Sequence, residues 1–193
     1  MIKKVCVYCA SSSKVNFQYV KTAEKLGEIL AENNLELVYG AGSVGLMGVL
    51  ADSALKKGGR VTGVIPRFMV EMEWQHDGLT ELILTETMHE RKLEMAKLAD
   101  AVVALPGGFG TMEELLEIIT WKQLGIHSLP IVIVNVNGYY NHLLAQFSQA
   151  ADELFVRPKH LDMWRVVNDV DNVLEALNNE KIIHEDIRRF AKI

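Results

Sequence analysis

Two glycine-rich segments carry the strongest chemical signals in this 193-residue chain. The first, Gly40-Ala-Gly-Ser-Val-Gly45, is a G-x-G-x-x-G pattern, and the second, Pro106-Gly-Gly-Phe-Gly-Thr111, ends three residues before Glu114. Glycine allows a backbone to approach a ligand closely, and the start of a following helix offers free N–H groups to a phosphate. We therefore expect the first segment to bind phosphate through Gly42 and Gly45, with no role for a metal ion.

The first pattern is also compatible with a dinucleotide site. In dinucleotide-binding proteins the pattern follows the first strand, and the next strand ends at an acidic residue that binds the ribose. Here the pattern follows the second expected strand, and the next strand ends in Ile65-Pro66-Arg67. Arg67 could meet the 2′-phosphate of NADP, so an NADP-dependent reductase remains an alternative to a simpler nucleotide site.

Glu114 has both a structural and a chemical interpretation. Thr111 and Glu114, like Thr87 and Glu90, match a capping box, in which side chains satisfy the first backbone N–H groups of a helix. Capping would explain the glutamate, but it does not require the glycines before it. Those glycines indicate that a ligand approaches the backbone, so the carboxylate could act on that ligand.

Two other polar segments leave similar alternatives open. Arg91 could pair with Glu94 on the surface of a helix, or face the strand ends and present a permanent cation to phosphate or carboxylate. The serines at residues 11–13 follow the first expected strand. Serine is common in turns, but this location makes Ser12 a candidate ligand contact.

Short β-branched runs alternate with longer amphipathic segments along the whole chain. This alternation predicts an α/β fold of the Rossmann type, with a doubly wound, mainly parallel sheet and helices on both faces, in one domain spanning residues 1–193. The expected strands are Lys3–Tyr8, Glu36–Tyr39, Arg60–Ile65, Glu81–Thr85, Ala101–Leu105, Pro130–Asn135 and Trp164–Val167. The expected helices are Phe17–Glu32, Leu46–Lys57, Met88–Ala99, Met112–Leu124, Tyr139–Ala150 and Val170–Asn178, with a polar helix after them.

Composition excludes several classes of protein. The formal charge of −5 gives no general attraction to nucleic acid. The apolar runs are too short for a membrane span or the core of a signal peptide, so we expect a cytoplasmic protein. Cys6 and Cys9 lie three apart in a strand-like run, which points them to opposite faces as core thiols. The six histidines show no metal-ligand spacing.

Three motifs together resemble the lonely-guy family of cytokinin riboside 5′-monophosphate phosphoribohydrolases, formerly labelled lysine decarboxylase-like. These motifs are Gly45-Leu-Met-Gly48, Met88-His-Glu-Arg-Lys92 and Pro106-Gly-Gly-Phe-Gly-Thr-Met-Glu-Glu114. The resemblance implies hydrolysis of the N-glycosidic bond of a purine riboside 5′-monophosphate, either AMP or a cytokinin nucleotide. The products would be the free base and ribose 5-phosphate, no cofactor is needed, and a homodimer or higher homo-oligomer is favoured.

The resemblance also implies roles for individual residues. Arg91 and Glu114 match the catalytic pair of the family. Substrate contacts are implied or expected at Lys92, Gly107, Gly108, Phe109, Gly110 and Thr111 and, by spacing, at Glu73 and Thr120. Ala41 departs from the family pattern, in which glycine is frequent at this position. A non-catalytic nucleotide-binding protein remains the other alternative, whereas pyridoxal phosphate chemistry lacks a suitable lysine context.

Overall fold

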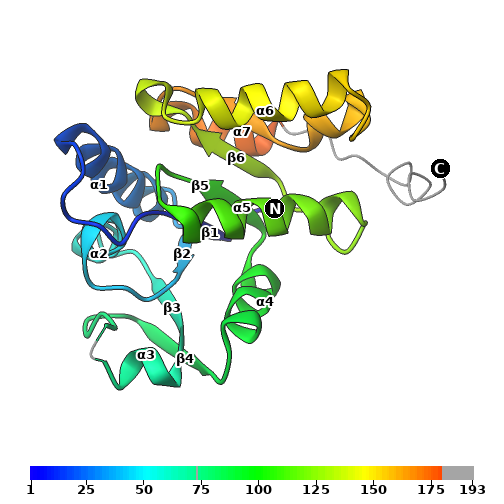
Figure 1. Cartoon of the computed structure of the whole chain (residues 1–193). Coiled ribbons are helices and arrows are strands. Elements are labelled where there is room, and N and C mark those ends of the chain that lie inside the picture. Colours follow the sequence, from blue (N-terminus) through cyan, green and yellow to red (C-terminus); the bar gives the residue numbers. More distant parts are fainter. Residues whose placement is uncertain (73, 180–193) are drawn as a thin grey trace.

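The computed structural model of the chain describes residues 1–72 and 74–179 (Figure 1). In this part of the chain, seven strands form one sheet in the order β4-β3-β2-β1-β5-β6-β7, and all neighbouring strands are parallel. Their bounds are β1 Lys4–Tyr8, β2 Glu36–Tyr39, β3 Val61–Pro66, β4 Glu81–Thr85, β5 Ala101–Ala104, β6 Ile131–Val134 and β7 Arg165–Val167. All seven strands were expected, and the α/β fold is confirmed.

Helices cover both faces of this sheet (Figure 1). One face packs against α1 Phe17–Glu32, α2 Gly45–Lys56 and α7 Val173–Asn178, and the other packs against α4 Met88–Leu98, α5 Phe109–Gln123 and α6 Asn141–Asp152. The remaining described helical segments are α3 Arg67–Val70 and the 3-10 turns Val136–Gly138, Pro158–Met163 and Val170–Asn172. The polar helix expected after residue 178 falls almost entirely outside the described residues.

The two core layers explain why the central strands are apolar throughout. Every residue of β5 and β6 is buried, because side chains alternate between the two faces and a helix layer covers each face. Cys6 packs in one layer and Cys9 in the other, so the prediction of buried thiols on opposite faces is confirmed. Cys9 lies one residue beyond β1, which ends at Tyr8 as expected and begins at Lys4, one residue later than expected.

The strand order places a topological switch point between β1 and β5. Successive strands β1 to β4 extend in one direction, whereas β5 lies on the other side of β1. The connections that leave these two strands diverge, and ligands bind in the resulting crevice at the carboxyl ends. The loops touch at its base, where the N–H of Ala10 donates to the Pro106 carbonyl over 3.3 Å.

Four local expectations about helices need correction. α7 begins at Val173 instead of Val170, because residues 170–172 form a 3-10 turn. α5 begins at Phe109, three residues earlier than expected, and α3 was not expected at all. α6 begins only at Asn141, because the residues before it form a 3-10 turn in which Asn137 and Gly138 have φ of 55° and 69°. No described helix is both long and apolar enough to cross a membrane.

Candidate active site

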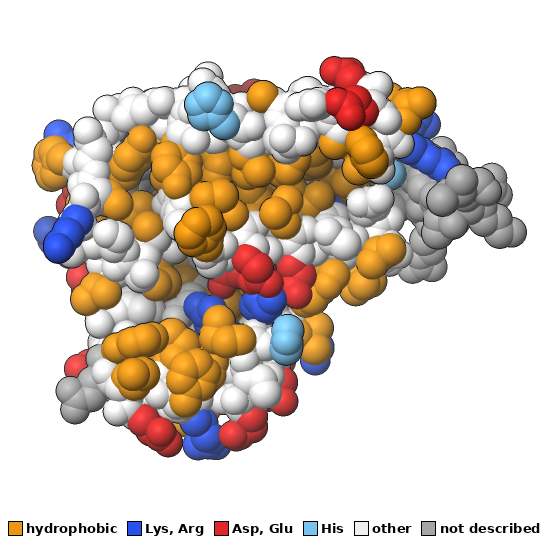
Figure 2. Space-filling view, in the orientation of Figure 1, with side chains coloured by type: hydrophobic (Ala, Val, Ile, Leu, Met, Phe, Trp, Pro, Cys, Tyr) orange, Lys and Arg blue, Asp and Glu red, His pale blue; other side chains and the backbone are white. Residues whose placement is uncertain are grey.

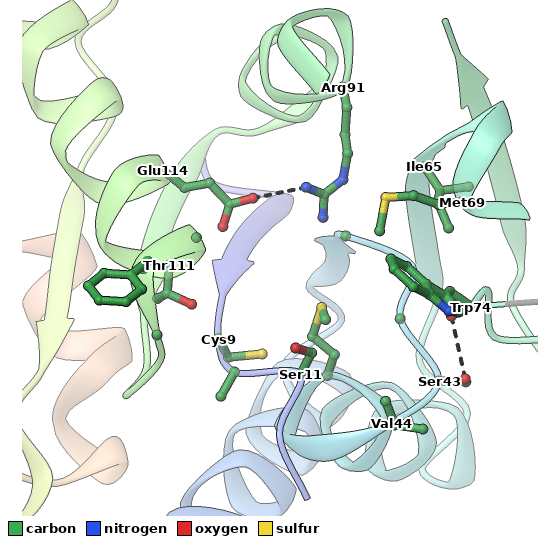
Figure 3. A pocket seen from close by; sticks show the side chains of 17 residues that line it. Cys9, Ser11, Ser43, Val44, Ile65, Met69, Trp74, Arg91, Thr111 and Glu114 are labelled. Carbon is green, nitrogen blue, oxygen red and sulfur yellow. Dashed lines mark hydrogen bonds and ion pairs between the residues drawn. The ribbon is translucent and has the colours of Figure 1, made fainter. Parts of the chain in front are cut away.

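A cavity of about 540 Å³ lies at the carboxyl ends of the strands near this switch point (Figure 3). Small-molecule sites commonly have volumes of about 300–1,000 Å³. The segments after β1, β2, β3 and β5 and the start of α4 all contribute to its wall. The lining residues are Cys9, Ala10, Ser11, Gly40, Gly42, Ser43, Val44, Met47, Ile65, Met69, Trp74, Arg91, Gly108, Phe109, Gly110, Thr111 and Glu114.

Arg91 and Glu114 form a buried ion pair at one side of this cavity. Arg91 Nη1 donates to Glu114 Oε1 over 3.2 Å, and Arg91 Nε donates to the carbonyl of Val64 over 3.0 Å. Only 7% and 11% of the two side chains are exposed. Figure 3 shows the side chains pointing toward each other from α4 and α5. Arg91 therefore faces the strand ends, and the alternative pair with Glu94 does not form.

The first glycine segment makes room for this arginine. A Cβ atom built on Gly40 would lie 1.8 Å from Arg91 Nη2, so no larger residue fits while the guanidinium keeps its position. Ala41, next in the chain, has φ of 60°, a left-handed conformation that favours glycine. Gly40 belongs to the first glycine motif, but nothing in that motif indicates that it makes room for the arginine.

The environment of Glu114 changes its acidity. Burial raises the pKa of this carboxyl from 4.5 to about 6, although the positive charge of Arg91 opposes the shift. Nearby Glu113 and Glu117 raise the pKa further, and Lys92 lowers it. At neutral pH the group is mostly ionised, yet it is a stronger base than an exposed glutamate. This combination is typical of a carboxylate that stabilises a cation or accepts a proton from water.

The capping-box interpretation of Thr111 and Glu114 is wrong. α5 starts at Phe109 with Gly108 as its N-cap, and no side chain caps it. Glu114 therefore lies in the second turn, where its carboxylate faces Arg91 instead of the helix start. The box at α4 forms only in part: Thr87 accepts from the N–H of Glu90, whose own carboxylate accepts from residue 86.

Two helix N-termini border the cavity without side-chain caps. α2 begins at Gly45 after Val44, and α5 begins after Gly108, with no side-chain hydrogen bond at either cap. Cβ atoms built on Gly108 and Gly110 would meet nothing within 4 Å, so the backbone there is open to an incoming ligand. The N–H of Met47 in the first turn of α2 already donates to the Ala10 carbonyl over 3.2 Å. The remaining N–H groups and the partial positive charge of both helix ends suit an anion.

An apolar wall lies beside this polar edge, and no motif in the sequence predicted it. Met47, Ile65, Met69 and Trp74 contribute to it, and Figure 3 shows Met69 and Trp74 on the side of the cavity away from Glu114. The carbonyl of Trp74 accepts from the N–H of Ser43 over 3.2 Å, and this hydrogen bond joins the segment that follows α3 to the first glycine segment. The cluster of large apolar residues after the third strand was the available signal.

Several residues that were expected to contact the substrate do not line the cavity in the described part of the chain. Ser12 is exposed and its hydroxyl accepts from the N–H of Lys14, whereas its neighbour Ser11 lines the cavity. Gly45 does not line the cavity either. It packs against the backbone of Ser11, and a Cβ built on Gly45 would lie 2.3 Å from the carbonyl carbon of Ser11. Gly107 is buried beneath Thr111, and a Cβ there would meet the threonine hydroxyl.

Three polar side chains that were expected at the site also point elsewhere. The Lys92 ammonium lies between the carboxylates of Glu113 and Glu117, at 3.0 Å from the latter. Burial lowers the pKa of the lysine, but these two carboxylates outweigh that effect and raise it. Thr120 donates to a carbonyl of its own helix, and Arg67 pairs with an exposed glutamate over 2.7 Å. Glu73 lies outside the described residues. Of the candidate contacts, Gly42, Gly108, Phe109, Gly110 and Thr111 do line the cavity.

No cluster of three or more potential metal-binding side chains is present in the described ranges. The two charged residues at the cavity wall, Arg91 and Glu114, are already engaged with each other. The site is therefore described by an ion pair, two helix ends and an apolar wall.

Comparison with known proteins identifies the family. A family profile described as "Possible lysine decarboxylase" matches residues 47–177. Cytokinin riboside 5′-monophosphate phosphoribohydrolase LOG5 of Arabidopsis thaliana is 41% identical over 185 residues, which cover 96% of this chain and 81% of that protein. The chain belongs to the lonely-guy family. Cytokinin riboside 5′-monophosphate phosphoribohydrolase LOG7 of the same plant is 49% identical over 156 residues, which cover 81% of this chain and 72% of that protein.

A solved structure shows that the fold extends beyond close relatives of this lonely-guy protein. A molybdenum cofactor carrier protein from Chlamydomonas reinhardtii matches with a TM-score of 0.71 over 92% of this chain and 97% of that chain. Its sequence is 20% identical, so the likeness concerns the fold alone.

Proposed function

We propose that this protein hydrolyses the N-glycosidic bond of a purine riboside 5′-monophosphate to the free base and ribose 5-phosphate. The observation that carries the proposal is the buried Arg91–Glu114 pair on a nucleotide-sized cavity bordered by uncapped helix ends. Relatives 41–49% identical bear the name of this activity for cytokinin nucleotides. Water is the co-reactant, and no cofactor takes part in the proposed reaction.

Glu114 is the proposed catalytic carboxylate. Cleavage of the bond between C1′ and the purine nitrogen leaves an oxocarbenium-like sugar, which a nearby carboxylate stabilises. The same carboxylate orients the attacking water and accepts its proton, since burial has raised the glutamate pKa to about 6. The water oxygen bonds to C1′, and the bonding electrons leave with the purine, which takes up a proton.

Arg91 acts in this proposal as a fixed charge. A guanidinium does not give up its proton at physiological pH, so it is not the acid that protonates the base. Its two described hydrogen bonds, to Glu114 and to the Val64 carbonyl, fix the carboxylate relative to the sheet. The arginine thus orients the catalytic group and adds positive charge beside the anionic substrate.

The phosphate is proposed to bind at the helix N-termini, with Gly42, Gly108, Gly110 and Thr111 in contact. These residues line the cavity, and the backbone at two of them has open space where a side chain would stand. Binding energy from a phosphate that does not react can align the sugar for cleavage. Discrimination between AMP and adenosine is therefore expected.

The apolar wall is proposed to contact the base. Trp74 and Met69 offer flat and flexible apolar surfaces, and with Met47 and Ile65 they could cover adenine or an apolar substituent on its amino group. Such a wall has no polar group that must be paired with the substituent. We therefore propose that both AMP and a cytokinin riboside 5′-monophosphate are accepted.

The deciding experiment follows release of free base by chromatography. AMP, adenosine, a cytokinin riboside 5′-monophosphate and NADP are incubated separately with the wild-type protein, Glu114→Gln and Glu113→Gln. The second variant is a matched control, because Glu113 lies on the same helix and its carboxylate pairs with Lys92 away from the cavity. Base release from the two monophosphates, lost only in Glu114→Gln, is the expected result.

Binding of AMP without release of adenine would contradict the proposal in favour of a non-catalytic nucleotide-binding protein. The NADP-dependent reductase loses its main support, since Arg67 is paired outside the cavity lining. Turnover that requires NADP would nevertheless refute a simple hydrolase.

We also propose that the protein assembles as a homodimer or higher homo-oligomer through the exposed side of α5. Leu116 and, at the C-cap, Leu124 are exposed there, whereas Ile119 is buried and Trp121 packs against the core. Phe109 is 92% exposed at the start of the helix. Figure 2 shows hydrophobic side chains gathered over the region of α5 and α6. A Leu116→Glu, Leu124→Glu double variant should elute as a monomer; an unchanged mass in light scattering would exclude this interface.

A further inference from the structure

Two adjacent tyrosines hold the loop between β5 and α5 from outside the cavity. The hydroxyl of Tyr139 donates to the carbonyl of Gly107, and the hydroxyl of Tyr140 donates to the carbonyl of Leu105 over 2.7 Å. Neither tyrosine lines the cavity, and neither belongs to a motif singled out from the sequence. The two hydrogen bonds flank Pro106, so the stretch that leads into α5 is held at two points.

The segment that carries the tyrosines is built rigidly. The side chain of Asn135, itself buried, accepts from the N–H of Tyr140 over 2.7 Å and donates to the side chain of Asn141 over 2.8 Å. Between them, the left-handed conformations of Asn137 and Gly138 reverse the chain. A non-glycine residue in this conformation costs free energy and persists where surrounding contacts demand it.

The ring of Tyr139 is held as well as its hydroxyl. Tyr19 of α1 packs edge-on against it with ring centroids 5.7 Å apart, and Tyr140 packs edge-on at 5.0 Å. Aromatic pairs in this geometry stabilise each other beyond their buried area. The hydroxyl therefore points at the Gly107 carbonyl from a ring whose orientation is fixed on two sides.

The peptide unit between Gly107 and Gly108 is the one that needs holding. Gly107 is buried against Thr111, whereas Gly108 is exposed and lines the cavity, and a Cβ built on it would meet nothing within 4 Å. A peptide between two glycines rotates with little steric resistance. Its carbonyl and its N–H point in opposite directions. With the carbonyl on Tyr139, the Gly108 N–H points away from that ring, and it has no acceptor among the described residues.

We propose that Tyr139 is a positioning residue for phosphate recognition: it fixes the Gly107–Gly108 peptide so that the N–H of Gly108, not the Gly107 carbonyl, faces the bound phosphate. This inference rests on the proposed function for the identity of the ligand. Rotation of the peptide would turn a carbonyl oxygen toward the phosphate, where a donor is needed. Tyr140 holds the preceding turn and has no part in this selection.

The test compares Tyr139→Phe with Tyr140→Phe, two substitutions that each remove one hydroxyl and keep the ring. Isothermal titration calorimetry measures the affinity of each protein for ribose 5-phosphate and, separately, for adenine. Tyr139→Phe should weaken ribose 5-phosphate binding about fivefold, the equivalent of one ordinary hydrogen bond, and leave adenine binding within about twofold. Its KM for AMP should rise by a similar factor while kcat changes little.

The control should behave differently. Tyr140→Phe loses a buried hydrogen bond, so its melting temperature should fall while both affinities stay at the wild-type values. Unchanged ribose 5-phosphate binding in Tyr139→Phe, equal weakening of both ligands, or the same loss in Tyr140→Phe would each overturn the assignment.

Failure of the proposed function gives a distinct result. A wild-type protein that binds ribose 5-phosphate but releases no base contradicts the proposed hydrolysis only, and the comparison of the two variants still decides the role of Tyr139. A wild-type protein that releases base from AMP but does not bind ribose 5-phosphate contradicts only the role assigned to Tyr139, and one that neither binds ribose 5-phosphate nor releases base contradicts both.

Discussion

Replacement of Glu114 by glutamine should make the protein less active, and the stability of the variant relative to the wild type should increase as the pH rises. Burial raises the carboxyl pKa from 4.5 to about 6, which means that the folded protein disfavours the ionised form. Glutamine resembles the protonated carboxyl in shape and carries no charge to bury. A shift of this size corresponds to about 2 kcal/mol of unfolding free energy.

The sign of the effect follows from proton linkage. Because the folded-state pKa is higher than the unfolded one, the stability that this group contributes is fully present below pH 4.5 and is lost as pH rises through about 6. Glu114→Gln has no such loss. The difference in unfolding free energy between variant and wild type should therefore be about 2 kcal/mol more favourable to the variant near pH 8 than near pH 4.

Urea denaturation of both proteins across this pH range is the assay. Constant offsets caused by the substitution cancel, since only the change of the difference with pH is used. A difference that does not vary with pH would refute the raised pKa. A difference of the opposite sign would show that the charge of Arg91 outweighs burial and holds the pKa below 4.5.

The same pKa predicts the activity profile of the wild-type protein. Ionised Glu114 is the proposed catalytic form, so kcat/KM should fall about tenfold per pH unit well below pH 6. An acid limb centred near 4.5 instead would indicate that the catalytic carboxyl is exposed to solvent in the working enzyme. Glu114→Gln should lose at least about 100-fold in kcat at neutral pH.

Four further substitutions test other parts of the site. Gly40→Ala places a Cβ on the guanidinium of Arg91 and should lower kcat at least about 100-fold, and wild-type kinetics would disprove this contact. Gly108→Ala should raise the KM for AMP and leave the melting temperature unchanged. Gly107→Ala should instead lose about 1–3 kcal/mol of stability in thermal unfolding, because only the new Cβ at residue 107 meets a packed side chain, that of Thr111. Lys92→Met should cost about 1 kcal/mol in urea denaturation, since its carboxylate partners on α5 are partly exposed; loss of AMP affinity without loss of stability would instead indicate a direct substrate contact.

Much of the fold could be predicted because the pattern of apolar residues has a direct physical cause. Strands such as 131–134 are apolar throughout since helix layers bury both faces of the sheet, and the alternation with amphipathic helices selects a parallel arrangement. The start of α5 could not be predicted in the same way. The Thr-x-x-Glu spacing at residues 111–114 is identical to that of a capping box, which predicts a later helix start. Glycine also has a low helix propensity, yet here Gly108 is the N-cap and Gly110 lies in the first turn of the helix.

The candidate site was predicted in its chemistry but not in its shape. Arg91 and Glu114 were predicted from motifs. Their 3.2 Å contact was not, because it joins two helices that are separated by β5 in the chain. Gly40, Met69 and Trp74 were missed, because their part in the site depends on which loops meet above the sheet. Tyr139 was missed for the same reason, since it follows β6 in the chain and its hydroxyl reaches the carbonyl of Gly107 in the loop between β5 and α5.

The sequence by itself determined the layered α/β fold, the family and the two residues proposed for catalysis, because these depend on local periodicity and on motifs that are contiguous in the chain. The tertiary structure decided which of the named residues reach the cavity, which instead pair elsewhere, and how acidic Glu114 is. Those properties depend on solvent exclusion and on distances between segments far apart in the chain. A pKa near 6 arises only when packed helices remove water from a carboxylate and leave one arginine beside it.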